Sequence, residues 1–245
     1  ILKLGEKKFR AGQIYSWLHE KNAKSFDEIT CLSKDFRNTL SERFYIPSVE
    51  TVRILKSKID KTQKFLYKLE DGNYVETVAM NYHHGTSLCI STQVGCKMGC
   101  RFCASAIAGF VRDLKPSEML LQIYESERNI GEKIDSIVLM GIGEPLDNYD
   151  NVMKFFDILS SPEGRNMSLR HVTMSTCGIV PKINELAEKK LGITLSVSLH
   201  SSDNEHRDAI MPVNKAYNIN KLINACRDYV KKTGRRVTFE YAVIE

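Results

Sequence analysis

Three cysteines lie close together between residues 96 and 103, in a stretch that reads Cys-Lys-Met-Gly-Cys-Arg-Phe-Cys. Cys96, Cys100 and Cys103 therefore have the spacing C-x3-C-x2-C. A cubane iron–sulfur cluster normally takes four thiolates. Three thiolates on one short loop would leave one iron free to bind a substrate or cofactor, as a catalytic zinc site keeps one position open. The spacing therefore predicts an open [4Fe-4S] cluster on this loop.

Two other interpretations of this loop have less support. A structural zinc knuckle would need a fourth cysteine or histidine nearby, and the nearest downstream histidine is His171. A disulfide would suit a secreted protein, but no signal peptide is visible and the seven cysteines are an odd number.

Further polar residues follow predicted strands along the chain. A Gly-Ile-Gly-Glu sequence ends at Glu144, where glycines would let the backbone approach a ligand closely and the carboxylate would accept from an amino group. Ser175 could hydrogen-bond a ligand carboxylate or a ribose hydroxyl. Ser198 and His200 close another strand and are expected to face the same cleft.

Three more residues allow two interpretations each. Cys89 lies seven residues before the cluster loop; it is either a buried, inert thiol or a redox-active group. Glu76 either lies in solvent or points inward as a base. Cys177 is expected to be a small buried residue rather than a metal ligand.

The elements that must position these residues alternate between strand and helix. Strands are expected at 86–92, 134–140, 170–175, 193–199 and 237–244, with helices near 116–131, 148–160, 180–190 and 219–232. This alternation predicts parallel β/α units, and barrel-type folds carry their chemistry at the C-terminal ends of the strands. We predict an α/β fold, a partial (βα)6 barrel that is cut short after its fifth strand.

Residues 1–80 follow a different pattern. Amphipathic helices are expected at 7–20 and 33–44, followed by antiparallel strands at 50–57, 63–69 and 73–80. Residues 1–72 hold 15 Lys and Arg against 10 Asp and Glu, which accounts for the whole net charge of +5. We therefore predict a basic, RNA-binding accessory domain at 1–80 and a core domain at 81–245; an ordinary charged surface is the alternative.

Composition limits the cellular setting. Hydrophobic residues make up 42% of the 245 residues, which is enough for a core. No apolar run approaches the roughly 20 residues of a membrane span, so we expect no membrane association. Free thiols beside a cluster suit a reducing compartment, and we expect a cytoplasmic protein.

Taken in order, these motifs resemble the RlmN/Cfr family of radical S-adenosylmethionine (SAM) adenosine methyltransferases. The resemblance covers nearly the whole chain. It is carried by the cysteine loop and by TSLCISTQVGC at 86–96, GIGEPL at 141–146, STCGIVP at 175–181, SLH at 198–200 and RDAIMPVN at 207–214. The proline after Glu144 resembles the RlmN branch, which methylates adenine C2; the C8-modifying Cfr branch typically has alanine there.

The resemblance implies a radical-SAM barrel and a division of roles within it. The [4Fe-4S] cluster would be held by Cys96, Cys100 and Cys103. The positions that match the family's SAM contacts are Gly143, Glu144, Ser175, Ser198, Leu199 and His200. Glu76 matches the family's base, and Cys89 matches the cysteine that resolves the protein–RNA adduct.

The resemblance also implies partners and a mechanism. The substrate would be 23S rRNA, with tRNA as a second candidate, and the protein would be a monomer that takes electrons from a flavodoxin or ferredoxin. One SAM methylates a cysteine, and a second is cleaved to a radical that activates the methyl group for addition to the adenine ring. The family's methyl-carrying cysteine follows the sixth strand, and no cysteine here lies in a matching motif.

Two rival hypotheses remain open at this point. Another radical-SAM enzyme, such as a glycyl-radical activase, would share the cysteine loop but not Cys89, Glu76 or the basic N-terminal unit. A non-catalytic iron–sulfur module for RNA binding or electron transfer would favour four protein ligands. An assay of SAM binding would distinguish the non-catalytic module from both enzymes. An assay of RNA methylation would distinguish an RNA methyltransferase from another radical-SAM enzyme.

We expect these 245 residues to bind the cluster but not to methylate RNA, because none of their cysteines lies in a motif that matches the methyl-carrying cysteine of the family. Incubation of the reconstituted protein with radiolabelled SAM and RNA should leave the RNA unlabelled. Transfer of label to RNA would contradict this expectation.

Overall fold

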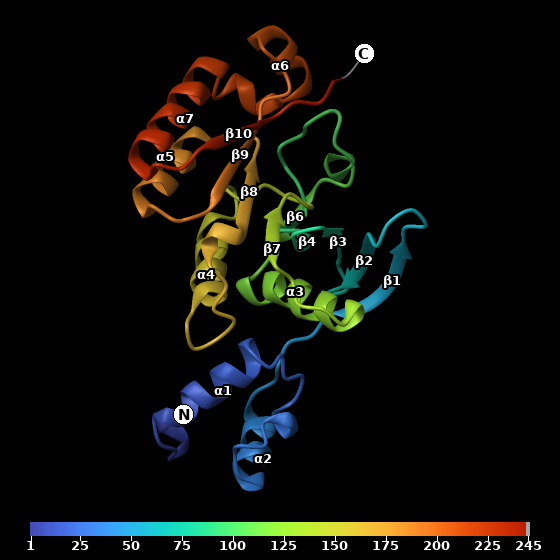
Figure 1. The fold of residues 1–245 in the computed structure, drawn as a ribbon, viewed down its shortest axis with the longest axis vertical. Helices are drawn as coiled ribbons and strands as arrows, with labels where there is room; N and C mark the ends of the chain where they lie inside the picture. Colours follow the sequence, from blue (N-terminus) through green and yellow to red (C-terminus); the bar gives the residue numbers. More distant parts are fainter. Residues whose placement is uncertain (244–245) are drawn as a thin grey trace.

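The computed structural model describes residues 1–243 and contains one large mixed sheet. Its eight strands lie in the order β1-β2-β3-β4-β7-β8-β9-β10 (Figure 1). The antiparallel part consists of β1 (Glu50–Lys56), β2 (Gln63–Lys68) and β3 (Tyr74–Tyr82). The strands that run parallel are β4 (Gly85–Ile90), β7 (Ser136–Leu139), β8 (Val172–Thr176), β9 (Thr194–Ser198) and β10 (Val237–Glu240). The predicted run of five parallel strands is therefore confirmed; the last residue of the fifth predicted strand, at 244, lies outside the described residues.

Helices connect the parallel strands as expected for β/α units. They are α3 (Pro116–Ile130), α4 (Tyr149–Ser160), α5 (Val180–Lys189) and α7 (Ile219–Thr233). Local sequence sets their ends: Pro116 occupies the first turn of α3, the side chain of Asn218 caps α7, and both helices end at a left-handed glycine. Within residues 1–243, no helix combines the length and the apolarity needed to span a bilayer.

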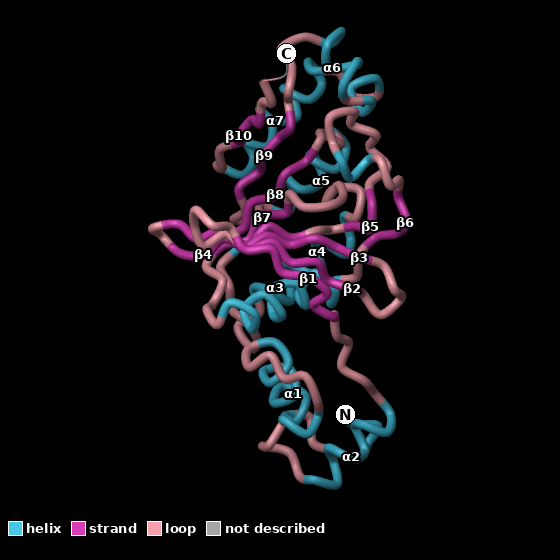
Figure 2. The backbone as a smooth tube through the Cα atoms, turned by 90° about the vertical axis from the view of Figure 1, so that its right-hand side faces the viewer, coloured by secondary structure: helices cyan, strands magenta, loops and turns pink. Residues whose placement is uncertain are grey.

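The two faces of the sheet differ in their packing. Alternate strand residues such as Leu88, Ile137, Met174 and Leu195 are fully buried in the main hydrophobic core, together with residues of the connecting helices. The intervening residues point to the opposite face, because successive side chains of a strand alternate. Figure 2 shows the strands of the large sheet as one continuous twisted layer.

The periodicity of the sequence did not predict three short elements. A two-stranded antiparallel ribbon consists of β5 (Gln93–Gly95) and β6 (Phe110–Asp113), and it brackets the cysteine loop. A short helix, α6 (Asn204–Ile210), follows β9. The backbone N–H of Arg101 in the cysteine loop donates to the carbonyl of Ile210, so this helix supports the loop directly.

The N-terminal helices form a unit with its own small core. The helices α1 (Phe9–His19) and α2 (Lys34–Arg43) lie at the end of the molecule opposite the C-terminal strand (Figures 1 and 2). The buried residues of this core fall between Ala23 and Leu40. The boundary predicted at residue 80 falls inside β3, which pairs with β4, so the sheet crosses it without a break.

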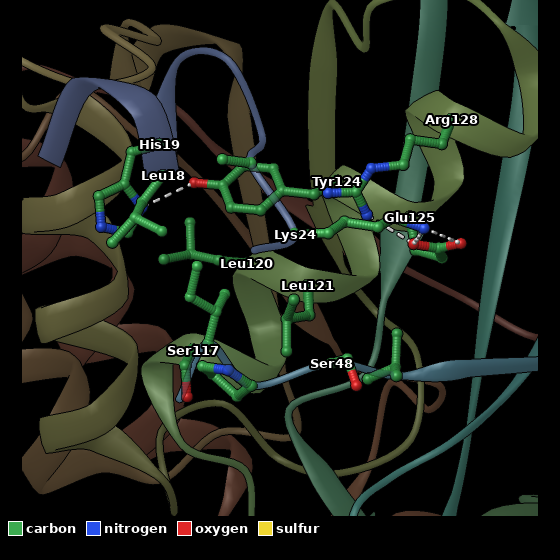
Figure 3. Close-up of a pocket in the computed structure, with 14 residues that line it drawn as sticks. Leu18, His19, Lys24, Ser48, Ser117, Leu120, Leu121, Tyr124, Glu125 and Arg128 are labelled. Carbon is green, nitrogen blue, oxygen red and sulfur yellow. Dashed lines mark hydrogen bonds and ion pairs between the residues drawn. The ribbon is translucent and has the colours of Figure 1, made fainter. Parts of the chain in front are cut away.

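The helical unit meets the core at α3, around an apolar cavity of about 190 Å³ (Figure 3). Polar contacts surround this cavity. His19 Nδ1 and the Tyr124 hydroxyl are 3.0 Å apart, and Lys24 and Arg128 both pair with Glu125. Asn22 adds two more contacts across the interface, because its carbonyl accepts from Arg128 and its amide donates to Glu127.

We predict that Phe36→Ala will destabilise the helical unit without unfolding the sheet. Phe36 is 5% exposed in the small core, and truncating a buried phenylalanine costs about 3–5 kcal/mol. Amide hydrogen exchange should show lost protection only within residues 1–46. The matched variant Phe155→Ala, in the main core, should instead lower protection across the sheet. Equal loss in the sheet for both variants would contradict two separate cores.

Candidate active site

The cysteine loop is held closed at its base by the β5–β6 ribbon. The N–H of Cys96 donates to the carbonyl of Gly109, 3.1 Å away, where the two strands of the ribbon meet. Gly95 has a φ of +72°, and a Cβ atom there would collide with the Gly109 carbonyl oxygen. Only glycine allows this crossing of the two strands, so the loop ends are fixed by backbone geometry.

The three thiols line a cavity of about 220 Å³ at the C-terminal ends of the parallel strands. Four strand ends and α6 surround it. Besides the three cysteines, the lining includes Gly141, Gly143, Glu144, Ser175, Cys177, Ser198, His200 and Glu240. The structure therefore brings together the cysteine loop and most of the strand-end residues that were predicted from the sequence.

The three thiols in this lining suit an iron–sulfur cluster, because thiolates are the ligands of such clusters. All three are partly buried, and burial raises the pKa of Cys100 to about 11 and raises that of Cys96 as well. Binding of a metal would release these protons, because thiolates are the ligands.

Cys177 lines the same cavity but lies on the segment after β8, outside the cysteine loop. It is 7% exposed, and burial together with the nearby Glu144 carboxylate raises the pKa of its thiol well above the usual value. The prediction that Cys177 is a small buried residue agrees with this position.

Glu144 is a buried carboxylate held by backbone donors. Its oxygens accept from the amides of Leu146 (3.0 Å) and Cys177 (2.7 Å). Burial raises its pKa, and the hydrogen bonds from Cys177, Thr176 and Leu146 partly oppose that shift. A cationic group in the cavity would favour the ionised form, which suits an acceptor for an ammonium group.

The two glycines before Glu144 are required for close packing, which the sequence did not suggest. A Cβ on Gly141 would lie 2.7 Å from the carbonyl of Ile90, and one on Gly143 would lie 2.6 Å from Cβ of Gln93. Both glycines therefore allow this loop to approach the end of β4 and β5. The expected close approach to a ligand is not needed to explain them, although Gly143 also lines the cavity.

Ser175 and Ser198 share a partner that we did not predict, Glu240 at the end of β10. Its carboxylate accepts from the hydroxyls of Ser175 (2.9 Å), Ser196 (2.6 Å) and Ser198 (2.8 Å). The rule that chemistry gathers at strand ends could have identified Glu240, because it lies within the strand predicted at 237–244.

His200 faces the cavity in a constrained conformation. Its φ of +55° is unusual for a residue other than glycine. Nδ1 accepts from the N–H of Ala242 (3.0 Å), so the neutral ring carries its proton on Nε2. The ring packs edge-on against Phe102 of the cysteine loop, with centroids 4.8 Å apart, and burial lowers its pKa.

Leu199 differs from the other predicted SAM contacts because its side chain packs against the main core rather than lining the cavity. Its carbonyl accepts from Nε of Arg207 (3.0 Å). The fully buried Arg207 also donates to the carbonyls of Cys177 (2.8 Å) and Ser198 (3.0 Å). This arginine belongs to the 207–214 motif, to which the sequence assigned no role.

Glu76 and Cys89 lie on the face of the sheet opposite the helices, but not in the lining of this cavity as residues 1–243 form it. Cys89 pairs in register with Val78, so Glu76 is its diagonal neighbour on the same face, with a separation of roughly 7–8 Å. Glu76 is half-exposed and pairs with Lys64 at 2.7 Å. Cys89 is half-buried, and burial raises its pKa.

Comparisons with known proteins agree with this arrangement. The model of the radical SAM superfamily matches residues 90–244, and that of the ribosomal RNA large subunit methyltransferase N-terminal domain matches residues 1–46. The second match coincides with the helical unit and its linker.

Curated relatives and a solved structure resemble nearly the whole chain. A "probable dual-specificity RNA methyltransferase RlmN" of Lachnospira eligens is 54% identical over 99% of this chain and 69% of its own length. The protein of that name from Thermoanaerobacter is 51% identical over 100% of this chain and 71% of its own length. The crystal structure of a radical SAM methyltransferase from Sphaerobacter thermophilus has a TM-score of 0.94 and 40% identity, and the match covers 100% of this chain and 72% of that one.

We predict that Gly141→Ala will destabilise the protein by about 1–3 kcal/mol, because the new methyl group would meet backbone atoms of Ile90 and Ser91 that cannot move aside. The urea midpoint should fall accordingly. Gly12→Ala is the matched control: Gly12 lies in α1 with open space around it, so alanine should stabilise by about 0.5–1 kcal/mol. An unchanged midpoint for Gly141→Ala would show that the loop does not approach β4 this closely.

Proposed function

Because this chain belongs to the RlmN family of radical SAM methyltransferases, we propose that it carries the cluster and SAM sites for methylating adenosine C2 in RNA. The proposed substrates are 23S rRNA and tRNA, and the reaction uses two SAM molecules and a methylcysteine. The name of the relatives, which includes "dual-specificity", and the proline after Glu144 support this choice.

One observation carries the proposal. The cysteine loop, the carboxylate of Glu144 and the polar ends of β8 and β9 converge on a single cavity. An electron-transfer module would need the thiols but not the polar wall opposite them. A site that binds an amino-acid and nucleoside ligand beside a cluster needs both.

The chemistry of the cavity lining suggests which residues hold the cluster and which residue binds the ammonium of SAM. Cys96, Cys100 and Cys103 would hold the [4Fe-4S] cluster and leave one iron for SAM. When bound, the cluster supplies the electron that cleaves SAM. Glu144 accepts from the ammonium of SAM, and its fixed backbone donors hold the carboxylate in place for that contact.

On the RNA side, we assign Glu76 as the base that removes the ring proton and Cys89 as the thiol that releases the product. Their positions as diagonal neighbours on the helix-free face support this pair. Lys64 holds the Glu76 carboxylate on that face. The target base must leave its stack to reach them, as for other base-modifying enzymes.

Charge supports RNA as the partner of the N-terminal part. The excess of positive charge lies in residues 1–72, which include the helical unit and the β1–β2 hairpin. Exposed lysines on the hairpin include Lys56, Lys58 and Lys61. We also propose a flavodoxin or ferredoxin as electron donor, a monomeric state and a cytoplasmic location, for which free thiols are suited.

The test is anaerobic reconstitution followed by iron and sulfide analysis and electron paramagnetic resonance with and without SAM. We expect about four irons per chain and a reduced-cluster signal that changes when SAM is added. Cys100→Ser should lose most of the iron, because one of three ligands is removed.

Cys31→Ser is the matched control, because Cys31 is exposed in the helical unit, and it should keep the iron and the response to SAM. Zinc in place of iron, or a cluster whose signal ignores SAM, would overturn the proposed function.

A further inference from the structure

Glu240 gathers three serine hydroxyls at one wall of the cavity. Ser175 and Ser196 donate to Oε1 and Ser198 donates to Oε2, from two neighbouring strands. A hydroxyl has one proton. Each of these serines has therefore used its only donor on Glu240 and has only lone pairs left for a ligand.

The position of Glu240 is fixed by the backbone around it. Its carbonyl accepts from the N–H groups of Leu199 (3.1 Å) and His200 (3.2 Å), which join the end of β10 to the end of β9. In the part of the chain that the structure describes, the carboxylate makes no ion pair, and Glu240 lines the cavity directly. The carboxylate is therefore held in place by the backbone of β10 and by three hydroxyl donors.

Glu240 and its three serines can accept further hydrogen bonds, but their hydroxyl donors are already used. A carboxylate has about four acceptor positions, and three are occupied here. The free position of Glu240 and the lone pairs of Ser175 and Ser198 face a ligand together. A ligand carboxylate or phosphate would meet repulsion at this place, whereas a group with several donors would be bound.

SAM has three kinds of donor: its ammonium, its ribose hydroxyls and its adenine amino group. The ammonium is already matched by Glu144, on a different strand end. The two adjacent ribose hydroxyls fit a wall with several closely spaced acceptors, and an acidic residue recognises a ribose diol in the same way in dinucleotide-binding folds.

We propose that Glu240 binds the ribose hydroxyls of SAM, with Ser175 and Ser198 as additional acceptors that it orients. This assignment rests on the proposed function, because that function supplies SAM as the ligand. It also changes the role expected for Ser175, which would accept from a ribose hydroxyl and would not donate to a carboxylate.

The test is a binding cycle that combines Glu240→Gln with analogues of the ligand. Calorimetry on the reconstituted protein would use S-adenosylhomocysteine, which is not cleaved, its 2′,3′-dideoxy analogue, and the analogue without the adenine amino group. We expect Glu240→Gln to weaken S-adenosylhomocysteine binding about ten-fold, as for the loss of a hydrogen bond to a charged group. The dideoxy analogue should bind wild type about ten-fold more weakly and should lose little further in the variant.

Controls separate the possible failures. Glu132→Gln, an exposed carboxylate remote from this cavity, should bind all three ligands as wild type does. If Glu240→Gln does not fold by circular dichroism, Glu240→Asp takes its place, since it keeps the charge and withdraws the carboxylate.

The assignment to the ribose would be overturned if the losses of binding free energy from Glu240→Gln and from the dideoxy analogue were additive. It would also be overturned if Glu240→Gln were coupled to the loss of the adenine amino group instead. Either result would leave the proposed function standing. Failure of the wild-type protein to bind S-adenosylhomocysteine, with a cluster signal that also ignores SAM, would overturn the proposed function and the assignment together.

Discussion

The geometry of the site depends on one buried cation, the guanidinium of Arg207. It is fully buried, and burial lowers its pKa, yet its direct acceptors are three carbonyls and the side chain of Asn214 rather than a carboxylate. Burying a charge costs several kcal/mol even after relaxation, so every donor must find an acceptor. The carbonyls that meet this need belong to Cys177, Ser198 and Leu199, at the ends of β8 and β9. A lysine could not reach them together, because it lacks the planar fork of five donors.

The opposite wall of the cavity is fixed by two buried amide side chains. Gln122 of α3 accepts from the N–H of Ser91 (2.8 Å) and donates to its carbonyl (3.0 Å), which holds the segment after β4. Gln93 accepts from the N–H of Glu144 (2.9 Å) and donates to Asp113 and Asp147 (both 2.8 Å). The glycine-rich loop, the β5–β6 ribbon and β4 are thus joined by the protein's own hydrogen bonds. The loop that carries the three thiols starts from this rigid base.

The long elements and the strand-end residues could be predicted from sequence because each leaves a local signal. Amphipathic periods and turn residues mark the helices and most strands to within a few residues. The β5–β6 ribbon, with strands of three and four residues, is too short to show a period. The continuity of the sheet across β3 and β4 is a long-range pairing without a distinct signal. Gln93, Gln122 and Arg207 are polar residues whose burial depends on partners far away in sequence, so one sequence cannot separate them from surface residues.

The helix-free face of the sheet explains why a cavity exists at all. On β8 and β9 this face carries only hydroxyl residues: Thr173 and Ser175 on one strand, and Thr194, Ser196 and Ser198 on the next. Barrels normally fill this space with large branched side chains, which pack into layers. Small hydroxyl side chains leave the space open and supply hydrogen bonds along its wall. Because the hydroxyls of Ser175, Ser196 and Ser198 donate to Glu240, this part of the wall presents acceptors, while the cysteine loop presents thiol ligands for a metal. The alternation of apolar and hydroxyl residues along two strands therefore encodes both the packed core behind the sheet and the polar wall in front of it.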